Sequence, residues 1–106
     1  MIEIDIIREK VGLGKYVISF THTEKLRARK IGAKELEQAI VNGKIIEPYP
    51  EDLRGPSCLI LGFADSGRPL HIVCGKVEEE EVLIITAYEP DANEWEADLI
   101  TRKKGG

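Results

Sequence analysis

The stretch that decides the fold is SCLILGFADSGRPLHIVCGKVEEEEVLIITAYE, residues 57–89. It holds three apolar runs rich in β-branched residues, which are separated by the polar connections DSGR and EEEE. Runs of this kind predict strands, and short polar connections between them predict an antiparallel meander. One residue breaks the pattern. The ionisable His71 stands in the second run, where the neighbouring residues indicate burial, and a histidine titrates close to neutral pH.

The sequence on either side of this stretch completes an α+β pattern. A short helix is favoured over a strand in the N-terminal segment 1–14, because Ile2, Ile6 and Ile7 share a helical face. The other expected elements are a strand over 15–20, helices over 24–30 and 32–43, a short strand over 44–50 and a polar C-terminal tail over 91–106 with one helical turn around Trp95. We therefore expect a single domain, residues 1–106, with two helices packed on one face of an antiparallel sheet of about four strands.

The first polar connection sets the expected register of the meander. A turn centred on Ser66 and Gly67 pairs Leu61 with Ile72 and Leu59 with Cys74, which places these apolar residues on one face. In this register Cys58 and Cys74 point to opposite faces. We therefore expect no disulfide across the strands.

The second connection places His71 opposite Tyr88. A turn centred on Glu79 and Glu80 makes these two residues direct cross-strand neighbours, on the face that also holds Val73 and Ile84. Leu83, Ile85 and Ala87 are expected on the helix-covered face. Two interpretations of the pair stay open. It is either a polar contact that only stabilises the sheet, or two proton-transfer groups on an open sheet face.

The distribution of charge narrows the range of partners. The formal net charge is −4, which argues mildly against broad binding of nucleic acid. Between Thr21 and Lys34, however, the local net charge is +4, because this segment contains five basic residues and one glutamate. Such a patch either binds phosphates or is a solvated helix face.

Several classes of function lack any signal in the chain. No apolar run approaches the ~20 residues that span a bilayer, so we expect no membrane partner. The start MIEIDIIREK carries acids among its isoleucines and no small-residue cleavage site, and the chain has two cysteines, so we expect a reduced cytoplasm. The patterns CxxC, HExxH, GxSxG and the P-loop are absent. We therefore expect neither a metal site nor a cofactor.

Several segments resemble the small prokaryotic family catalogued as domain-of-unknown-function family 4258. They are FTHTEKL, AIVNGKIIEPYPED, GPSCLILGF, GRPLHIVC and IITAYEPDANEWEADLITRK, and the similarity runs from about residue 16 to residue 103. That family is similar in element order to the RelE, BrnT and MqsR toxins of type II toxin–antitoxin systems. The resemblance implies a RelE-like fold and a ribonuclease toxin, neutralised by an MqsA-like antitoxin with a zinc finger and a helix-turn-helix.

The chain departs from these relatives in two respects. His22-Thr23 stands where the family commonly has a His-Ala pair, which keeps the imidazole. RelE-like toxins are typically basic, whereas this chain is net acidic.

The resemblance also implies roles for individual residues. In metal-independent RNA cleavage a base removes the ribose 2′-hydroxyl proton and an acid protonates the leaving 5′-oxygen, while cations stabilise the phosphate. We expect His71 and Tyr88 to be the acid–base pair, with His22 as an alternate. Arg29 and Arg68 are the expected phosphate ligands, and Arg102 is a third.

The implied partners are RNA and the antitoxin, with no direct contact to DNA. The competing hypothesis is a non-catalytic binding or regulatory module, or a degenerate toxin, whose open sheet face docks a protein or a small ligand.

Overall fold

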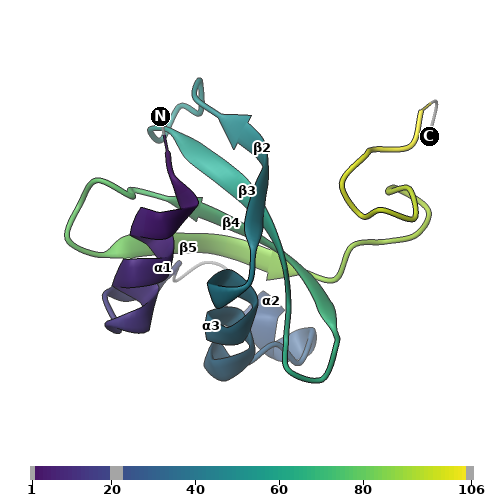
Figure 1. Ribbon diagram of the computed structural model, residues 1–106, viewed down its shortest axis with the longest axis horizontal. Helices are drawn as coiled ribbons and strands as arrows, with labels where there is room; N and C mark the ends of the chain where they lie inside the picture. Colours follow the sequence, from purple (N-terminus) through teal and green to yellow (C-terminus); the bar gives the residue numbers. More distant parts are fainter. Residues whose placement is uncertain (1, 20–22, 105–106) are drawn as a thin grey trace.

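The computed structural model describes residues 2–19 and 23–104, which form three helices and five strands (Figure 1). In chain order they are α1 (Ile4–Gly12), β1 (Tyr16–Ile18), α2 (Thr23–Ala28), α3 (Ala33–Val41), β2 (Lys44–Tyr49), β3 (Ser57–Phe63), β4 (Pro69–Gly75) and β5 (Val82–Tyr88). The protein is thus α+β with the expected element order. No helix in the described ranges is long and apolar enough to cross a membrane.

The five strands form one sheet in the order β1-β5-β4-β3-β2. The pairings β2–β3, β3–β4 and β4–β5 are all antiparallel, as the short connections between these strands predict. Two expectations need correction. The sheet has five strands rather than about four, and it is mixed, because β1 pairs with β5 in parallel. A parallel neighbour requires a long connection, and here α2, α3 and three strands separate β1 from β5.

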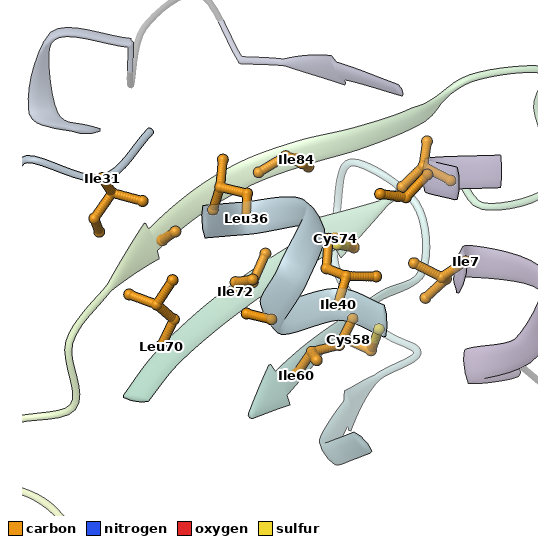
Figure 2. Close-up of a cluster of buried hydrophobic side chains, with 14 of the residues drawn as sticks. Ile7, Ile31, Leu36, Ile40, Cys58, Ile60, Leu70, Ile72, Cys74 and Ile84 are labelled. Carbon is orange, nitrogen blue, oxygen red and sulfur yellow. The ribbon is translucent and has the colours of Figure 1, made fainter. Parts of the chain in front are cut away.

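All three helices lie on one side of the sheet, and the C-terminal segment lies on the other (Figure 1). The prediction of two covering helices is therefore one too few, since α1 joins the same layer. Figure 2 shows the resulting core, in which Leu36 and Ile40 of α3 project toward Ile60 and Ile72 of the sheet. Burial of these aliphatic side chains away from water is the main source of stability on this side.

The register between β3 and β4 differs from the expected one by one residue. Leu61 lies opposite His71 and Ile60 opposite Ile72, because the connecting loop has five residues, 64–68, rather than an even number. Because side chains alternate between the two faces of a sheet, this shift of one residue exchanges the faces on which the side chains of β3 lie. Ile60 belongs to the helix-side core, whereas Leu59 and Leu61 lie on the opposite face.

The slip also corrects the expectation for the cysteines. Cys58 and Cys74 are direct cross-strand partners on the helix side rather than residues of opposite faces. Both are buried and free. The expected absence of a disulfide between them therefore agrees with the structure, but the geometric reason given for it was wrong.

A β-bulge changes the alternation along β5. His71 pairs with Tyr88 and Val73 with Thr86, as expected, but Cys74 then pairs with Ile84 instead of Ile85. The extra residue shifts the alternation, so that Ile84 joins the helix-side core. The expectations that Ile84 faces away from the helices, and that Leu83 and Ile85 face them, are therefore wrong.

The segment 91–104, which we call the C-terminal clip, folds back on itself. One helical turn closes through the amide of Trp95, which donates to the carbonyl of Asp91 at 3.0 Å. Trp95 then forms an isolated antiparallel bridge with Arg102. The expected helical turn is present, but the tail is an ordered clip with a buried tryptophan rather than a purely polar extension.

Candidate active site

His71 and Tyr88 are cross-strand neighbours on the sheet face opposite the helices. His71 Nδ1 lies 3.4 Å from Tyr88 Oη, and the two rings meet edge to face with centroids 5.4 Å apart. Because β4 and β5 pair at this position before the bulge, the predicted contact is present.

The imidazole of His71 is completely enclosed, with 0% of the residue exposed. Its Nε2 lies 2.7 Å from the carbonyl oxygen of Leu99 in the clip. A carbonyl only accepts, so Nε2 carries the proton and the lone pair of Nδ1 faces the hydroxyl of Tyr88. Burial lowers the pKa of His71, although the bond to Leu99 opposes this effect. His71 is therefore a neutral imidazole with both nitrogens engaged.

Trp95 covers the histidine. Its indole meets the imidazole edge to face, with centroids 4.4 Å apart, and only 3% of Trp95 is exposed. On the indole lies the guanidinium of Arg102, whose central carbon is 4.6 Å from the ring centroid. The clip thus packs on this face of the sheet through Trp95, which lies between His71 and Arg102.

Two side chains of β2 extend the polar cluster. Arg102 makes a bidentate ion pair with Glu47, with Nε–Oε2 and Nη2–Oε1 both at 2.9 Å, and Tyr49 donates its hydroxyl to Glu47 at 2.6 Å. The bond to Arg102 lowers the pKa of Glu47, while burial and the carboxylate raise that of Tyr49 to about 12. The charge of Glu47 also acts on His71. Glu47 is therefore a carboxylate at neutral pH within electrostatic reach of the imidazole.

Glu47 and Tyr49 were missed from the sequence. They stand two residues apart on β2, so their side chains share a face. This alternation was the available sequence signal. Pro48, which stands between them, indicates a strand at the edge of the sheet, and β2 is such a strand. The sequence could not show that this face is the one that carries His71.

Arg29 lies at the border of the same face. Its Nη1 donates to the carbonyl of Ala87 at 2.7 Å and lies 3.4 Å from the hydroxyl of Thr86. Thr86 and Tyr88 alternate onto the same side of β5. The side chain of Arg29 therefore reaches the strand that carries Tyr88, while the residue as a whole stays exposed.

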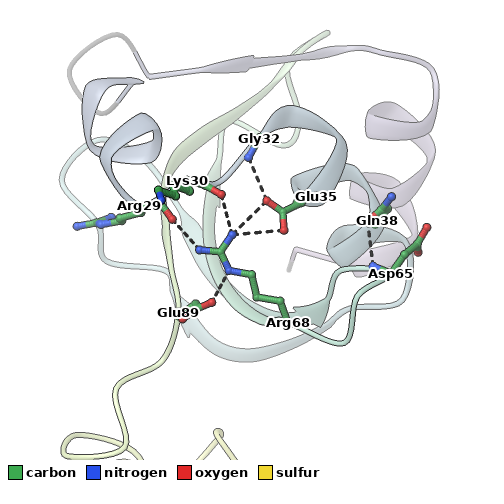
Figure 3. Close-up of polar contacts among 8 residues, drawn as sticks. All are labelled: Arg29, Lys30, Gly32, Glu35, Gln38, Asp65, Arg68 and Glu89. Carbon is green, nitrogen blue, oxygen red and sulfur yellow. Dashed lines mark hydrogen bonds and ion pairs between the residues drawn. The ribbon is translucent and has the colours of Figure 1, made fainter.

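Arg68 has a different place. Figure 3 shows its guanidinium surrounded by acceptors: it pairs with the carboxylates of Glu35 and Glu89 and donates to the carbonyls of Arg29 and Lys30 at 2.7 Å or less. Hydrogen bonding to Glu89 raises the pKa of Arg68 further. This arginine ties α2, α3 and the end of β5 together. Its donors are committed to the fold.

Of the six predicted site residues, the structure brings His71, Tyr88 and Arg102 into one cluster and places Arg29 at its border. Arg68 lies in a separate network, and His22 lies outside the described residues. Within the described ranges, no group of three metal-ligating side chains is placed to hold a metal ion.

A model of the family described as Domain of unknown function (DUF4258) matches residues 22–89, which is more than half of the chain. The chain therefore belongs to this family. No curated protein and no solved structure matches it.

Proposed function

We propose that this member of the DUF4258 family is the toxin-like component of a type II toxin–antitoxin system, with a RelE-like fold and a metal-independent endoribonuclease activity. Its partner would be an MqsA-like antitoxin. The observation that supports the proposal best is that the His71–Tyr88 pair and the carboxylate of Glu47 share the helix-free face of the sheet, with the charge of Glu47 acting on His71. Arg29 adds a cation at the edge of that face.

Each of these groups suits one part of RNA cleavage by the ribose 2′-hydroxyl. Glu47, ionised at neutral pH, is the general base that takes the 2′-hydroxyl proton. The 2′-oxygen then forms a bond to phosphorus as the bond from phosphorus to the 5′-oxygen breaks. His71 in its protonated form gives a proton to that leaving oxygen, and Tyr88 orients the imidazole through Nδ1.

The exposed basic residues of α2 supply the electrostatic part of the proposal. Lys25 and Arg27 lie on this helix, which packs against β5. With Arg29 they give a local excess of positive charge at and just after α2, although the protein as a whole carries a net charge of −4. Local cations of this kind bind the phosphates of RNA and stabilise the charge of the transition state.

The enclosure of His71 favours a second candidate function. Both of its nitrogens have partners and none of its surface is exposed, as in a histidine that only stabilises the fold. In that case the protein is a binding module without catalysis. The same experiment separates the two candidates.

The test is induced expression in a bacterial host, with growth and RNA integrity measured for the wild type and for His71→Ala. Leu70→Ala is the matched control, because Leu70 is the buried neighbour of His71 whose side chain points into the helix-side core. The proposal predicts growth arrest and RNA fragmentation for the wild type and for Leu70→Ala, and neither for His71→Ala, at equal soluble protein. Intact RNA and normal growth with the wild type would support the binding module.

A further inference from the structure

The C-terminal clip contacts two of the groups that the proposed chemistry needs. The carbonyl of Leu99 holds Nε2 of His71, Arg102 holds the carboxylate of Glu47, and the indole of Trp95 lies over the imidazole. We propose that the clip is an autoinhibitory strap that holds the active site closed, and that single-stranded RNA displaces it. This inference rests on the proposed ribonuclease function.

The contacts block the site chemically as well as sterically. The donor that His71 would offer to a leaving oxygen is occupied by a carbonyl, and the burial of the ring, over which Trp95 lies, lowers its pKa. The oxygens of Glu47 that would accept a proton are both paired with Arg102. Opening the strap releases Nε2 of His71 and leaves Glu47 with the bond from Tyr49 alone, and admitting water to His71 removes the burial that disfavours the imidazolium.

The position of the indole indicates the class of substrate. The indole of Trp95 meets the imidazole of His71 edge to face and lines a hollow together with Tyr88. An unpaired nucleobase has a similar flat aromatic surface and stacks readily on aromatic side chains. Bases in a duplex are not free to take the place of the indole. Single-stranded RNA is therefore the form that competes with the strap.

The strap is attached weakly enough to be displaced. Trp95 is the one residue of the clip with a buried side chain, and the Arg102–Glu47 pair lies at the surface, with 59% of the arginine and 24% of the glutamate side chain accessible. A bidentate pair at the surface stabilises modestly, so its loss shifts the strap toward the open form without unfolding the sheet. The helix-side core lies on the other face of the sheet and does not include the clip. Opening the strap therefore leaves the main core intact, as expected of a local unfolding unit.

Trp95 is the only tryptophan of the chain, so its fluorescence reports the position of the strap directly. The first experiment compares Arg102→Gln with Lys103→Gln, which removes the same charge from an exposed neighbour. Arg102→Gln is expected to red-shift the emission of Trp95, to raise its quenching by acrylamide and to speed cleavage of a single-stranded RNA oligonucleotide about fivefold. Lys103→Gln is expected to change none of these.

A second measurement uses the wild-type protein and a 2′-O-methyl RNA oligonucleotide, which lacks the attacking hydroxyl and so binds without being cleaved. Binding, measured by anisotropy of the labelled RNA, should expose Trp95 to acrylamide at the same RNA concentration. A 2′-O-methyl duplex should do neither. This arm does not depend on the folding of a variant.

The outcomes separate the strap from the nuclease. If the wild type cleaves RNA but Arg102→Gln exposes Trp95 without faster cleavage, the strap inference is wrong and the proposed function stands. Binding of 2′-O-methyl RNA that leaves Trp95 protected also overturns the strap. If RNA neither binds nor is cleaved, even with Trp95 exposed, the proposed function and the strap both fail.

Discussion

At the scale of single residues, His71 explains why an ionisable side chain stands in an apolar strand. Its two nitrogens join Tyr88 of the sheet to Leu99 of the clip, and the ring supports Trp95. A neutral imidazole with one donor and one acceptor satisfies both partners without burying a charge. The sequence identified the pairing with Tyr88, but not the clip above it.

This environment predicts a dependence of stability on pH. Burial holds the pKa of His71 below its ordinary value of 6.5, so the unfolded chain binds a proton more readily than the folded one. The contribution of His71 to the free energy of unfolding is therefore fully present above pH 6.5. It is lost as the pH is lowered toward the folded pKa. Urea denaturation between pH 7.5 and about 5 measures this slope, in a range above the titration of ordinary carboxylates.

A substitution at His71 itself is the check on that measurement. His71→Gln should remove most of the slope. A slope that persists in His71→Gln would contradict the assignment of His71 as a buried neutral group.

Arg68 shows how a loop arginine can join several elements of the fold. Its planar guanidinium contacts two carboxylates and two carbonyls at once, which an ammonium group cannot reproduce. We expect Arg68→Lys to lower the free energy of unfolding by about 1–3 kcal/mol, since bonds to charged groups are among the stronger ones. Chemical denaturation of the purified variant measures the loss.

Arg54→Lys is the control for this substitution. Arg54 pairs with Asp52 at the surface, with 64% of its side chain exposed, so the change should stay within about 0.5 kcal/mol. An Arg68→Lys protein as stable as Arg54→Lys would show that the network contributes little.

At the scale of elements, hydrophobic pattern and turn residues predicted the helices and strands, and their order. The face of α3 that carries Leu36, Ala39 and Ile40 is buried as its spacing indicates. The register of β3 against β4 was predicted wrongly, for a physical reason. In SCLILGF both faces are apolar, and both are buried in the structure, so alternation could not distinguish them.

The packing of α3 on β3 depends on a small residue. A Cβ added at Gly62 would overlap the carbonyl oxygen of Ala39 in α3. Because backbone atoms line this contact, the helix would have to move. We therefore expect Gly62→Ala to lower the free energy of unfolding by about 3 kcal/mol or more.

Gly12→Ala provides the contrast, because an added Cβ at that position meets nothing within 4 Å. Gly12 ends α1 and should accept alanine without loss. Thermal unfolding of the two variants measures the difference. Equal melting temperatures would contradict the close approach of α3 and β3.

At the scale of the whole molecule, the sheet is covered on both sides by unlike layers. Three helices build the larger core on one face, and fourteen residues of clip, 91–104, close the other around Trp95. The sequence predicted which face His71 occupies, and it treated that face as open. It could not show the closure, because the contacts of Leu99 and Arg102 join the end of the chain to β4 and β2.

The same long-range contacts decide which charged residues take part in the candidate site. Arg102 was predicted as a phosphate ligand, and in the structure it is paired with Glu47. In the proposed cycle it acts as the latch of the strap, while Arg29 remains at the border with an exposed side chain. The net acidity of the chain is compatible with this arrangement, because the cations that matter are local to α2.

The most direct test of the proposed chemistry is an end-group analysis of RNA incubated with the purified Arg102→Gln protein in the presence of a metal chelator. We expect fragments ending in a 2′,3′-cyclic phosphate, each matched by a fragment with a free 5′-hydroxyl, and no fragments with the double variant that also carries His71→Ala. Intact RNA, in a sample whose Trp95 fluorescence shows the strap to be open, would contradict it.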